Sequence, residues 1–344
     1  MSSISSKIIC SASVALVIIA GLLSYFFIIK HKSTSLDISK QLYTILDKYR
    51  VPYDIDKHSI DQSVDITPQA VTGVEQCIKN IEYFVAKNQP INMLAVGFPF
   101  KSGNQEKKVL GYLPDMAERK SLEYLQHMLN EIKAIYKPGA KILIFTDGIV
   151  FAEFFEIPIA NVIAYEKALK LLLLDLPDIT LYTSEDMLRS YGLTSVADII
   201  KFIDQYGPSD AQFKADVKEI SETALKRFAL ELDHPHGQLI LKKSSLEDIT
   251  TRLLAREMRL RTYLMQAFPS SEYFRLTVHL SPDVSKKFGI RLSPTSDITP
   301  YHGVLVQEAD GAWSIRFKKD IDSQQCPLSS ELINGVTCYY FKCK

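Results

Sequence analysis

Three short apolar runs, separated from one another by helical patterns, constrain the fold of this chain most. We predict buried strands at Ile91–Phe98, Ala140–Thr146 and Ile179–Thr183, because each run is apolar and too short for a helix. Between them, Glu118–Tyr136 and Ile159–Leu174 have the apolar spacing of helices. Alternating helices and apolar strands are typical of α/β architecture with a mostly parallel sheet.

The rest of the chain predicts a helical insertion followed by a β-rich part. Residues 184–264 are mostly helical in pattern, and strand-like segments follow at Tyr273–Leu280, Gly303–Glu308 and Ala312–Phe317. No sharp linker interrupts these segments. We therefore expect one α/β catalytic domain over residues 36–322 and a C-terminal tail over residues 323–344.

The N-terminus has a different character. Residues 8–29 contain no charged residue, Lys7 precedes them, and Lys30 and Lys32 follow. As a helix this run would span ~33 Å, enough for the hydrocarbon core of a bilayer. We predict an uncleaved transmembrane anchor with its tether over residues 1–35, rather than a signal peptide or a soluble apolar helix. The flanking charges leave its orientation nearly balanced.

Composition and motifs exclude several classes of function. Forty Lys plus Arg balance forty Asp plus Glu, which disfavours a nucleic-acid partner. There is no Walker loop, GxGxxG, GxSxG or HExxH, which disfavours a bound nucleotide cofactor and a serine nucleophile. No metal-ligand spacing joins His279 and His302 to Asp147 or Asp115, which disfavours a metal among these candidates. Of five cysteines, Cys338 and Cys343 could pair in an oxidising compartment, but free thiols in a reducing cytoplasm are the favoured reading.

Two loops follow predicted strands, where open α/β sheets bind their ligands. The first, Gly97–Asn104, carries Lys101 and Ser102, and the second, Thr146–Gly148, carries Asp147. A lysine there can hold a phosphate or carboxylate. A solvated loop lysine and an aspartate that serves only the turn are the commoner alternatives.

Further candidates share a helix face or a strand face. Asp115 and Glu118 start one helix, where they either orient a substrate or complement the helix dipole. Alternation places Arg275, Thr277 and His279 on one strand face, which is either an anion pocket with a titratable base or a solvent face. His302 lies in a turn before an apolar strand.

One helix carries a stripe of arginines, Arg252, Arg256 and Arg259, at spacings of four and three. The stripe could line a phosphate site. Pairing with surface acids such as Glu247, Asp248 and Glu257 is the favoured alternative.

Six motifs resemble, in order and spacing, those of the pyoverdine/dityrosine biosynthesis family, which includes the isonitrile (isocyanide) synthases. The resemblance covers about residues 36 to 320. The motifs are Phe98–Ser102, Gly111–Glu118, Tyr136–Ala140, Asp147–Phe151, Arg275–His279 and Thr299–Val304. Three positions depart from the family pattern: Gly103 replaces a proline, Ile149 a basic residue and Tyr301 a tryptophan.

The resemblance implies a Rossmann-like fold that uses no dinucleotide and no other cofactor. It implies conversion of the α-amine of tyrosine or tryptophan to an isonitrile, with ribulose 5-phosphate as the co-substrate that supplies the carbon. Because that sugar is cytosolic, it also implies a cytoplasmic catalytic domain. An iron/2-oxoglutarate oxygenase would act on the product.

For such chemistry we assign roles from residue type. Lys101 and Arg275 would contact anions or carbonyls, His279 and His302 would transfer protons, and Asp147 would position substrate. The remaining candidates would bind substrate: Ser102, Asp115, Glu118 and Arg256. Two alternatives stay open. The first is a related enzyme that makes an N-formyl tyrosine. The second is a non-catalytic, membrane-tethered α/β binding module, in which Lys101, Arg275, His279 and His302 would not meet in one pocket.

Overall fold

The computed structural model describes residues 34–51, 72–204, 246–278, 281 and 283–344. Its first sheet has five strands, all parallel, in the order β3-β2-β1-β4-β5. The strands are β1 (Ile91–Val96), β2 (Ala140–Phe145), β3 (Ile179–Tyr182), β4 (Phe274–Thr277) and β5 (Phe288–Gly289). This is the order of a doubly wound, Rossmann-like sheet, with the direction of winding reversed between β1 and β4. The predicted α/β fold with a parallel sheet is therefore observed.

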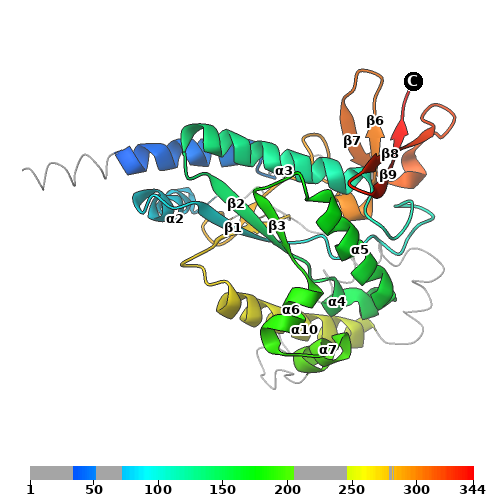
Figure 1. The fold of residues 1–344 in the computed structure, drawn as a ribbon, viewed down its shortest axis with the longest axis horizontal. Helices are drawn as coiled ribbons and strands as arrows, with labels where there is room; N and C mark the ends of the chain where they lie inside the picture. Colours follow the sequence, from blue (N-terminus) through cyan, green and yellow to red (C-terminus); the bar gives the residue numbers. More distant parts are fainter. Residues whose placement is uncertain (1–33, 52–71, 205–245, 279–280, 282) are drawn as a thin grey trace, which may run out of the picture.

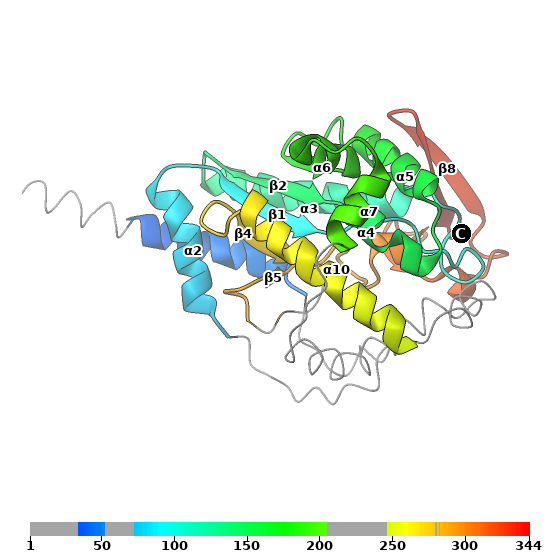
Figure 2. The same ribbon diagram turned by 90° about the horizontal axis from the view of Figure 1, so that it is seen from below.

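Helices cover both faces of this sheet (Figure 1, Figure 2). One face, called here the α3 face, packs against residues 34–48, α2 (Val74–Ala86), α3 (Met116–Ile135) and α5 (Ile159–Leu172). The other, the α10 face, packs against α4 (Gly148–Phe151), α6 (Ser184–Tyr191), α7 (Val196–Asp204) and α10 (Leu246–Ala267). Side-chain alternation explains the division. Met93 and Ala95 belong to the first core and Leu94 to the second.

The last three of these helices, α6, α7 and α10, lie between β3 and β4 in sequence, where the helical insertion was expected. Three short 3₁₀ helices complete the described elements: η3 (Ala152–Phe155), η4 (Pro300–His302) and η5 (Lys318–Asp320).

A second sheet of four strands, in the order β7-β6-β9-β8, forms the C-terminal part. Its strands are β6 (Val304–Gln307), β7 (Trp313–Arg316), β8 (Leu328–Ile333) and β9 (Val336–Lys342). The two antiparallel pairs β6–β7 and β8–β9 are joined by parallel pairing of β6 with β9. The apolar segments near residues 303–308 and 312–317 predict β6 and β7, whereas β8 and β9 were not expected. The division into residues 1–35, 36–322 and 323–344 stays a prediction.

The β8–β9 hairpin carries a clear signal that the sequence analysis missed. Ile333-Asn334-Gly335-Val336 places Asn-Gly between two strands, and both central residues have positive φ (50° and 85°). A two-residue turn of this type matches the twist of the strands it joins.

The predicted membrane helix requires correction. In the part of the chain that the structure describes, no helix combines the length and the apolar character needed to cross a bilayer. The described segment that follows the predicted anchor, residues 34–48, is a helix with exposed and buried positions packed on the sheet. Residues 8–29 lie outside the described residues. The prediction of a transmembrane helix in this fold is therefore wrong. The membrane localisation inferred from that helix is wrong with it.

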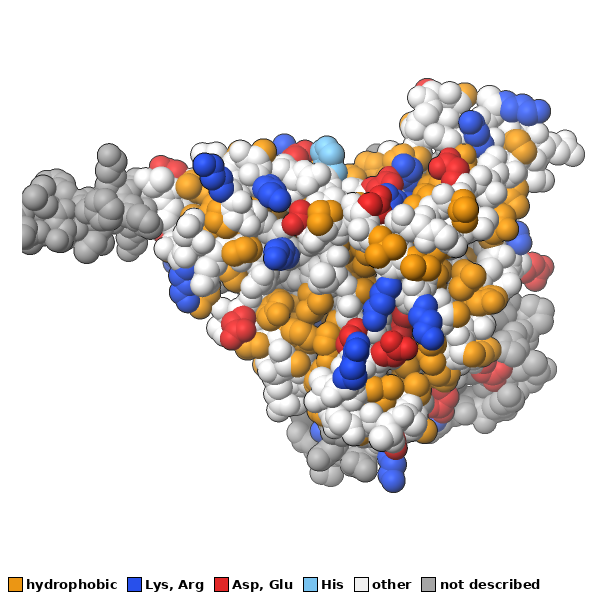
Figure 3. Space-filling model, in the orientation of Figure 1, with side chains coloured by type: hydrophobic (Ala, Val, Ile, Leu, Met, Phe, Trp, Pro, Cys, Tyr) orange, Lys and Arg blue, Asp and Glu red, His pale blue; other side chains and the backbone are white. Residues whose placement is uncertain are grey.

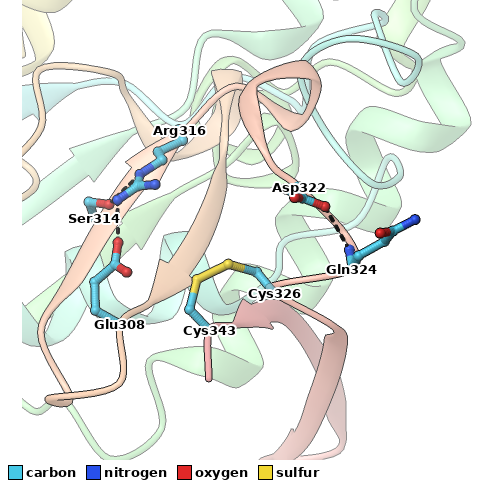
Figure 4. The surroundings of a disulfide bond; sticks show 7 residues. All are labelled: Glu308, Ser314, Arg316, Asp322, Gln324, Cys326 and Cys343. Carbon is cyan, nitrogen blue, oxygen red and sulfur yellow. Dashed lines mark hydrogen bonds and ion pairs between the residues drawn. A yellow bond between two sulfur atoms is a disulfide. The ribbon is translucent and has the colours of Figure 1, made fainter.

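The suggested Cys338–Cys343 pair is wrong, and the favoured reading of free thiols holds for Cys77 and Cys338 but not for Cys326 and Cys343. Cys326 is disulfide-bonded to Cys343, with their Cα atoms 3.9 Å apart (Figure 4). Cys77 and Cys338 are buried free thiols. Cys338 cannot pair with Cys343 because both follow the extended course of β9, where five residues span roughly 17 Å. A disulfide requires Cα atoms within about 7 Å.

Candidate active site

The chain bends sharply where it leaves β1 at the point of strand-order reversal. Phe98 has a positive φ of 55°, a region that a bulky side chain rarely adopts. Its ring is buried and packs edge-on against Tyr301, with 5.9 Å between centroids. Strained backbone of this kind clusters at functional sites, because the surrounding structure must hold it in place.

Beyond this bend, Lys101 points into the interior and joins a buried ionic cluster. Its Nζ lies 3.0 Å from Asp115 Oδ2 and 2.9 Å from Glu118 Oε2. The ammonium also donates to the backbone carbonyls of Pro300 (2.9 Å) and Gly303 (3.3 Å). The Lys101 side chain is 0% exposed. The loop after β1 is thereby fastened both to the start of α3 and to the η4 turn that carries His302.

Both carboxylates of this cluster also cap α3. Asp115 is the N-cap residue and accepts from Ala117 N–H (2.8 Å), while Glu118 accepts from Asp115 N–H (2.9 Å). This reciprocal pair is a capping box. The same side chains that start the helix also bind a buried lysine, and their contact with substrate stays a prediction.

Tyr165 is a member of the cluster that the sequence analysis missed. Tyr165 lies on α5, and its hydroxyl donates to Glu118 Oε1 at 3.1 Å. Its ring is fully buried. In sequence it looks like one more apolar position of a helix. Only the packing of α5 beside α3 places its hydroxyl against a carboxylate.

Burial gives this cluster unusual proton affinities. Desolvation raises the pKa of Glu118 to about 8, assisted by Asp115 and opposed by Lys101. Desolvation alone would lower the pKa of Lys101, but the two carboxylates outweigh it and raise that pKa. Burial and Glu118 hold the Tyr165 pKa well above its usual value. The cluster therefore keeps a charged ammonium and contains a carboxyl group that exchanges its proton near neutral pH.

Asp147 follows β2 in the neighbouring loop, at the N-terminus of α4. The next residue is glycine out of necessity, because a Cβ at Gly148 would lie 2.0 Å from the carbonyl oxygen of Pro99. The loops after β1 and β2 are thus in contact. Asp147 keeps part of its surface accessible, yet desolvation raises its pKa to about 7, with smaller contributions from Glu257 and Glu166.

His302 and Ser102 lie on either side of the same contact between loops. Ser102 N–H donates to the Tyr301 carbonyl at 2.9 Å, and the Ser102 side chain is buried. His302 is half-buried, with Nδ1 3.2 Å from Thr299 Oγ1 and its ring 4.7 Å from that of Tyr301. The structure therefore brings Lys101, Ser102, Asp115, Glu118 and His302 into one region.

The predicted arginines lie elsewhere. Arg275 faces α10, where its guanidinium donates to the carbonyl oxygens of Leu264 (3.3 Å) and Phe268 at the end of that helix. Asp115 and Glu118 start α3, on the opposite face of the sheet. Desolvation lowers the pKa of Arg275. The predicted grouping of Arg275 with Lys101 is therefore not observed.

Arg256, on α10, is buried and donates to Val150 O (3.0 Å) and Glu153 Oε2 (2.7 Å). It also lies over the Phe154 ring, 4.6 Å from the centroid. Arg252 donates to Glu153 as well, at 3.1 Å. Glu153, an acid in η3, therefore pairs with two arginines of this stripe. His279 lies outside the described residues.

Two further observations concern metal-binding groups and the distribution of charge on the surface. Among the residues that the structure describes, no three His, Cys, Asp or Glu side chains come together as a metal-binding group. On the face of the molecule in Figure 3, acidic and basic side chains are interspersed rather than gathered into one patch.

A doubly wound sheet with charged side chains at its point of strand-order reversal defines a Rossmann-like α/β protein, a class in which ligands bind beyond the carboxyl ends of the strands. Residues 81–328 match the pyoverdine/dityrosine biosynthesis protein family, and the chain belongs to that family. The resemblance inferred from six motifs is therefore confirmed.

Similar proteins identify the type of enzyme. The chain is 30% identical to an L-tyrosine isonitrile synthase of Pseudomonas aeruginosa, over 85% of this chain and 90% of the relative. It is also 30% identical to the L-tryptophan isonitrile synthase AmbI2 of Fischerella ambigua, over 67% and 72%. The crystal structure of the PvcA protein from Pseudomonas aeruginosa has the same fold, with a TM-score of 0.72 and 22% identity over 89% of this chain and 100% of that one. The chain is an enzyme of the isonitrile-synthase type.

Proposed function

We propose that this protein converts the α-amine of an aromatic L-amino acid to an isonitrile, with ribulose 5-phosphate as the carbon donor. The observation that carries the proposal is the similarity, along nearly the whole described fold, to isonitrile synthases named for tyrosine and for tryptophan. Both relatives share 30% identity with this chain, so identity alone does not choose between the two amino acids.

The chemistry begins with attack of the substrate amine on the sugar ketone. The ammonium form must lose a proton first, and the carbinolamine must gain one to expel water. Asp147, with a pKa of about 7 and partial exposure, is suited to both transfers. The half-buried imidazole of His302 is a second candidate for proton transfer.

Lys101 serves this reaction as a positioning residue, because its fully buried ammonium contacts two carboxylates and two backbone carbonyls. It holds the η4 turn, and so His302, against the start of α3. Glu118 belongs to the same cluster and has a carboxyl group with a pKa of about 8. Tyr165 donates a hydrogen bond to that carboxyl group.

Arg275 and Arg256 already donate to α10 and α4 backbone carbonyls, which supports a structural role for both. Their substrate contacts, and those of His279 and Ser102, stay predictions. So does an iron/2-oxoglutarate oxygenase that consumes the product.

The test is to incubate the purified full chain with tyrosine or tryptophan and ribulose 5-phosphate. Product mass is read, and any isonitrile is trapped with a tetrazine. An isonitrile adduct supports the proposal. A product with the mass of the N-formyl amino acid, or no product from folded protein, contradicts it and favours the related formyl chemistry or a binding module, respectively.

A further inference from the structure

A pocket of about 120 Å³ opens between the loop after β1 and the segment that joins η3 to α5. Phe100, Phe155 and Ile157 supply apolar walls, and Ser102, Gln105 and Asn161 supply polar groups. The rings of Phe100 and Phe155 are 5.7 Å apart and inclined at 57°, which leaves two aromatic surfaces on the pocket. Walls of this kind suit a flat apolar group with a polar end.

The pocket is near, and somewhat below, the volume that holds one six-membered ring, and its open end adds room. An apolar cavity of about 150 Å³ takes up benzene in another protein, whereas an indole needs more room. Tyr112 also lines the pocket and is 45% exposed, so this wall extends to the surface.

The same loop joins this pocket to the ionic cluster. Lys101 lines the pocket, while its ammonium lies among Asp115, Glu118 and the η4 carbonyls. Ser102 lines it too, and its N–H binds the backbone of the turn that carries His302. A ligand in the pocket therefore lies against the loop that contacts the turn carrying His302.

Glycine at position 103 keeps the pocket open. A Cβ there would lie 3.2 Å from Ile157 Cδ1 and 3.8 Å from the Phe155 carbonyl oxygen. A larger side chain would press against the wall opposite the loop and narrow the space between them. Gly111, in contrast, has no atom within 4 Å of such a Cβ.

We propose that this pocket binds the ring of the amino-acid substrate and selects a single six-membered ring, that of tyrosine, over the indole of tryptophan. The proposal rests on the proposed function for its ligand. Gln105 and Asn161 are the groups that can meet the phenolic hydroxyl, and Gly103 sets the width.

Isothermal titration of the full chain with L-tyrosine and with L-tryptophan tests the pocket without turnover. Tyrosine is expected to bind about tenfold tighter, since misfit in an apolar pocket changes binding by that order. Gly103→Val is expected to weaken tyrosine binding by about tenfold or more. The matched control Gly111→Val changes it by less than about twofold, as surface substitutions do.

Phe155→Ala provides a second variant if Gly103→Val does not fold. Removing this ring widens the pocket and is expected to raise tryptophan affinity relative to tyrosine. Equal affinities in the wild type, or tyrosine binding unchanged in both folded variants, would overturn the proposal. If tyrosine binds as expected but no isonitrile forms, the proposed function fails and the pocket stands. If isonitrile forms with the same tyrosine-to-tryptophan ratio in every variant, the pocket fails alone.

Discussion

At the scale of single residues, the decisive feature is a lysine that no solvent reaches. Lys101 balances two buried carboxylates and binds two backbone carbonyls, so it fixes three separate segments at once. A buried charge is tolerated only when its partners and hydrogen bonds are complete. The carboxylates in turn begin α3, which makes helix initiation and the geometry of the site depend on the same atoms.

Replacing Lys101 by Met is therefore expected to cost about 3–5 kcal/mol of unfolding free energy, because two carboxylates lose their buried partner. Denaturant unfolding of wild type, Lys101→Met and the exposed control Lys137→Met measures this. Adding Asp115→Asn to Lys101→Met should recover part of the loss, since an amide needs no cationic partner and can still cap α3. Equal stability of Lys101→Met and Lys137→Met would show that the cluster is not built as described.

Asp147 makes stability depend on pH. Its pKa is raised from 3.8 to about 7, so the folded chain holds a proton that the unfolded chain has released between these values. Stability must then fall as pH rises through that window. The thermal midpoint of wild type, relative to that of Asp147→Asn, should decrease from pH 4 to pH 7. A difference that stays constant over this range would contradict the raised pKa.

At the scale of elements, the C-terminal hairpin is closed at its base by a disulfide and linked to the rest of the molecule by polar contacts. The Cys326–Cys343 disulfide joins the segment before β8 to the end of β9 across 17 residues (Figure 4). Asn334, in the hairpin turn, donates to Asp175 Oδ1 at 2.9 Å. Asp175 also accepts hydrogen bonds from both terminal guanidinium nitrogens of Arg119, a residue of α3, each at 2.6 Å. The hairpin is thereby positioned beside the helix that carries Asp115 and Glu118.

Removing the disulfide is expected to lower stability by about 3 kcal/mol, the value for closing a loop of this length. Thermal unfolding of wild type and of Cys326→Ser/Cys343→Ser, each with and without a reductant, measures the loss. Reductant should destabilise wild type to the level of the double variant and leave the variant unchanged. A wild type indifferent to reduction would indicate that this bond does not stabilise the fold.

At the scale of the whole molecule, the two sheets share one hydrophobic core. Val336, Cys338 and Tyr340 of β9 belong to the same buried cluster as Leu122 and Leu125 of α3 and Met93 of β1. Trp313, in β7, packs against that cluster too. The second sheet is therefore part of the core that supports the site and not an appended module.

We expect the two sheets to unfold together. Trp313 is the single tryptophan of the chain, so its fluorescence reports on the second sheet, while far-ultraviolet circular dichroism reports on all elements. The two signals should give the same thermal midpoint, as a cooperative transition requires. A separate, earlier fluorescence transition would mean that the C-terminal sheet unfolds independently.

The sequence by itself determined the elements that obey local rules. Apolar runs gave β1, β2 and β3, helical spacing gave α3 and α5, and alternation assigned Leu276 and Arg275 to opposite faces of β4. The six motifs were enough for the family. The Asn334-Gly335 turn was equally legible and was overlooked.

Tertiary structure alone decided which candidates meet. Lys101 and Asp115 were named from sequence, but their contact, and the part played by Tyr165, depend on how α3, α5 and η4 pack around one loop. Arg275 was separated from them because the sheet lies between its face and theirs. Local sequence fixes which face a side chain takes, whereas proximity across the fold and burial, which shifts the proton affinities of Glu118 and Asp147, exist only once the layers have packed.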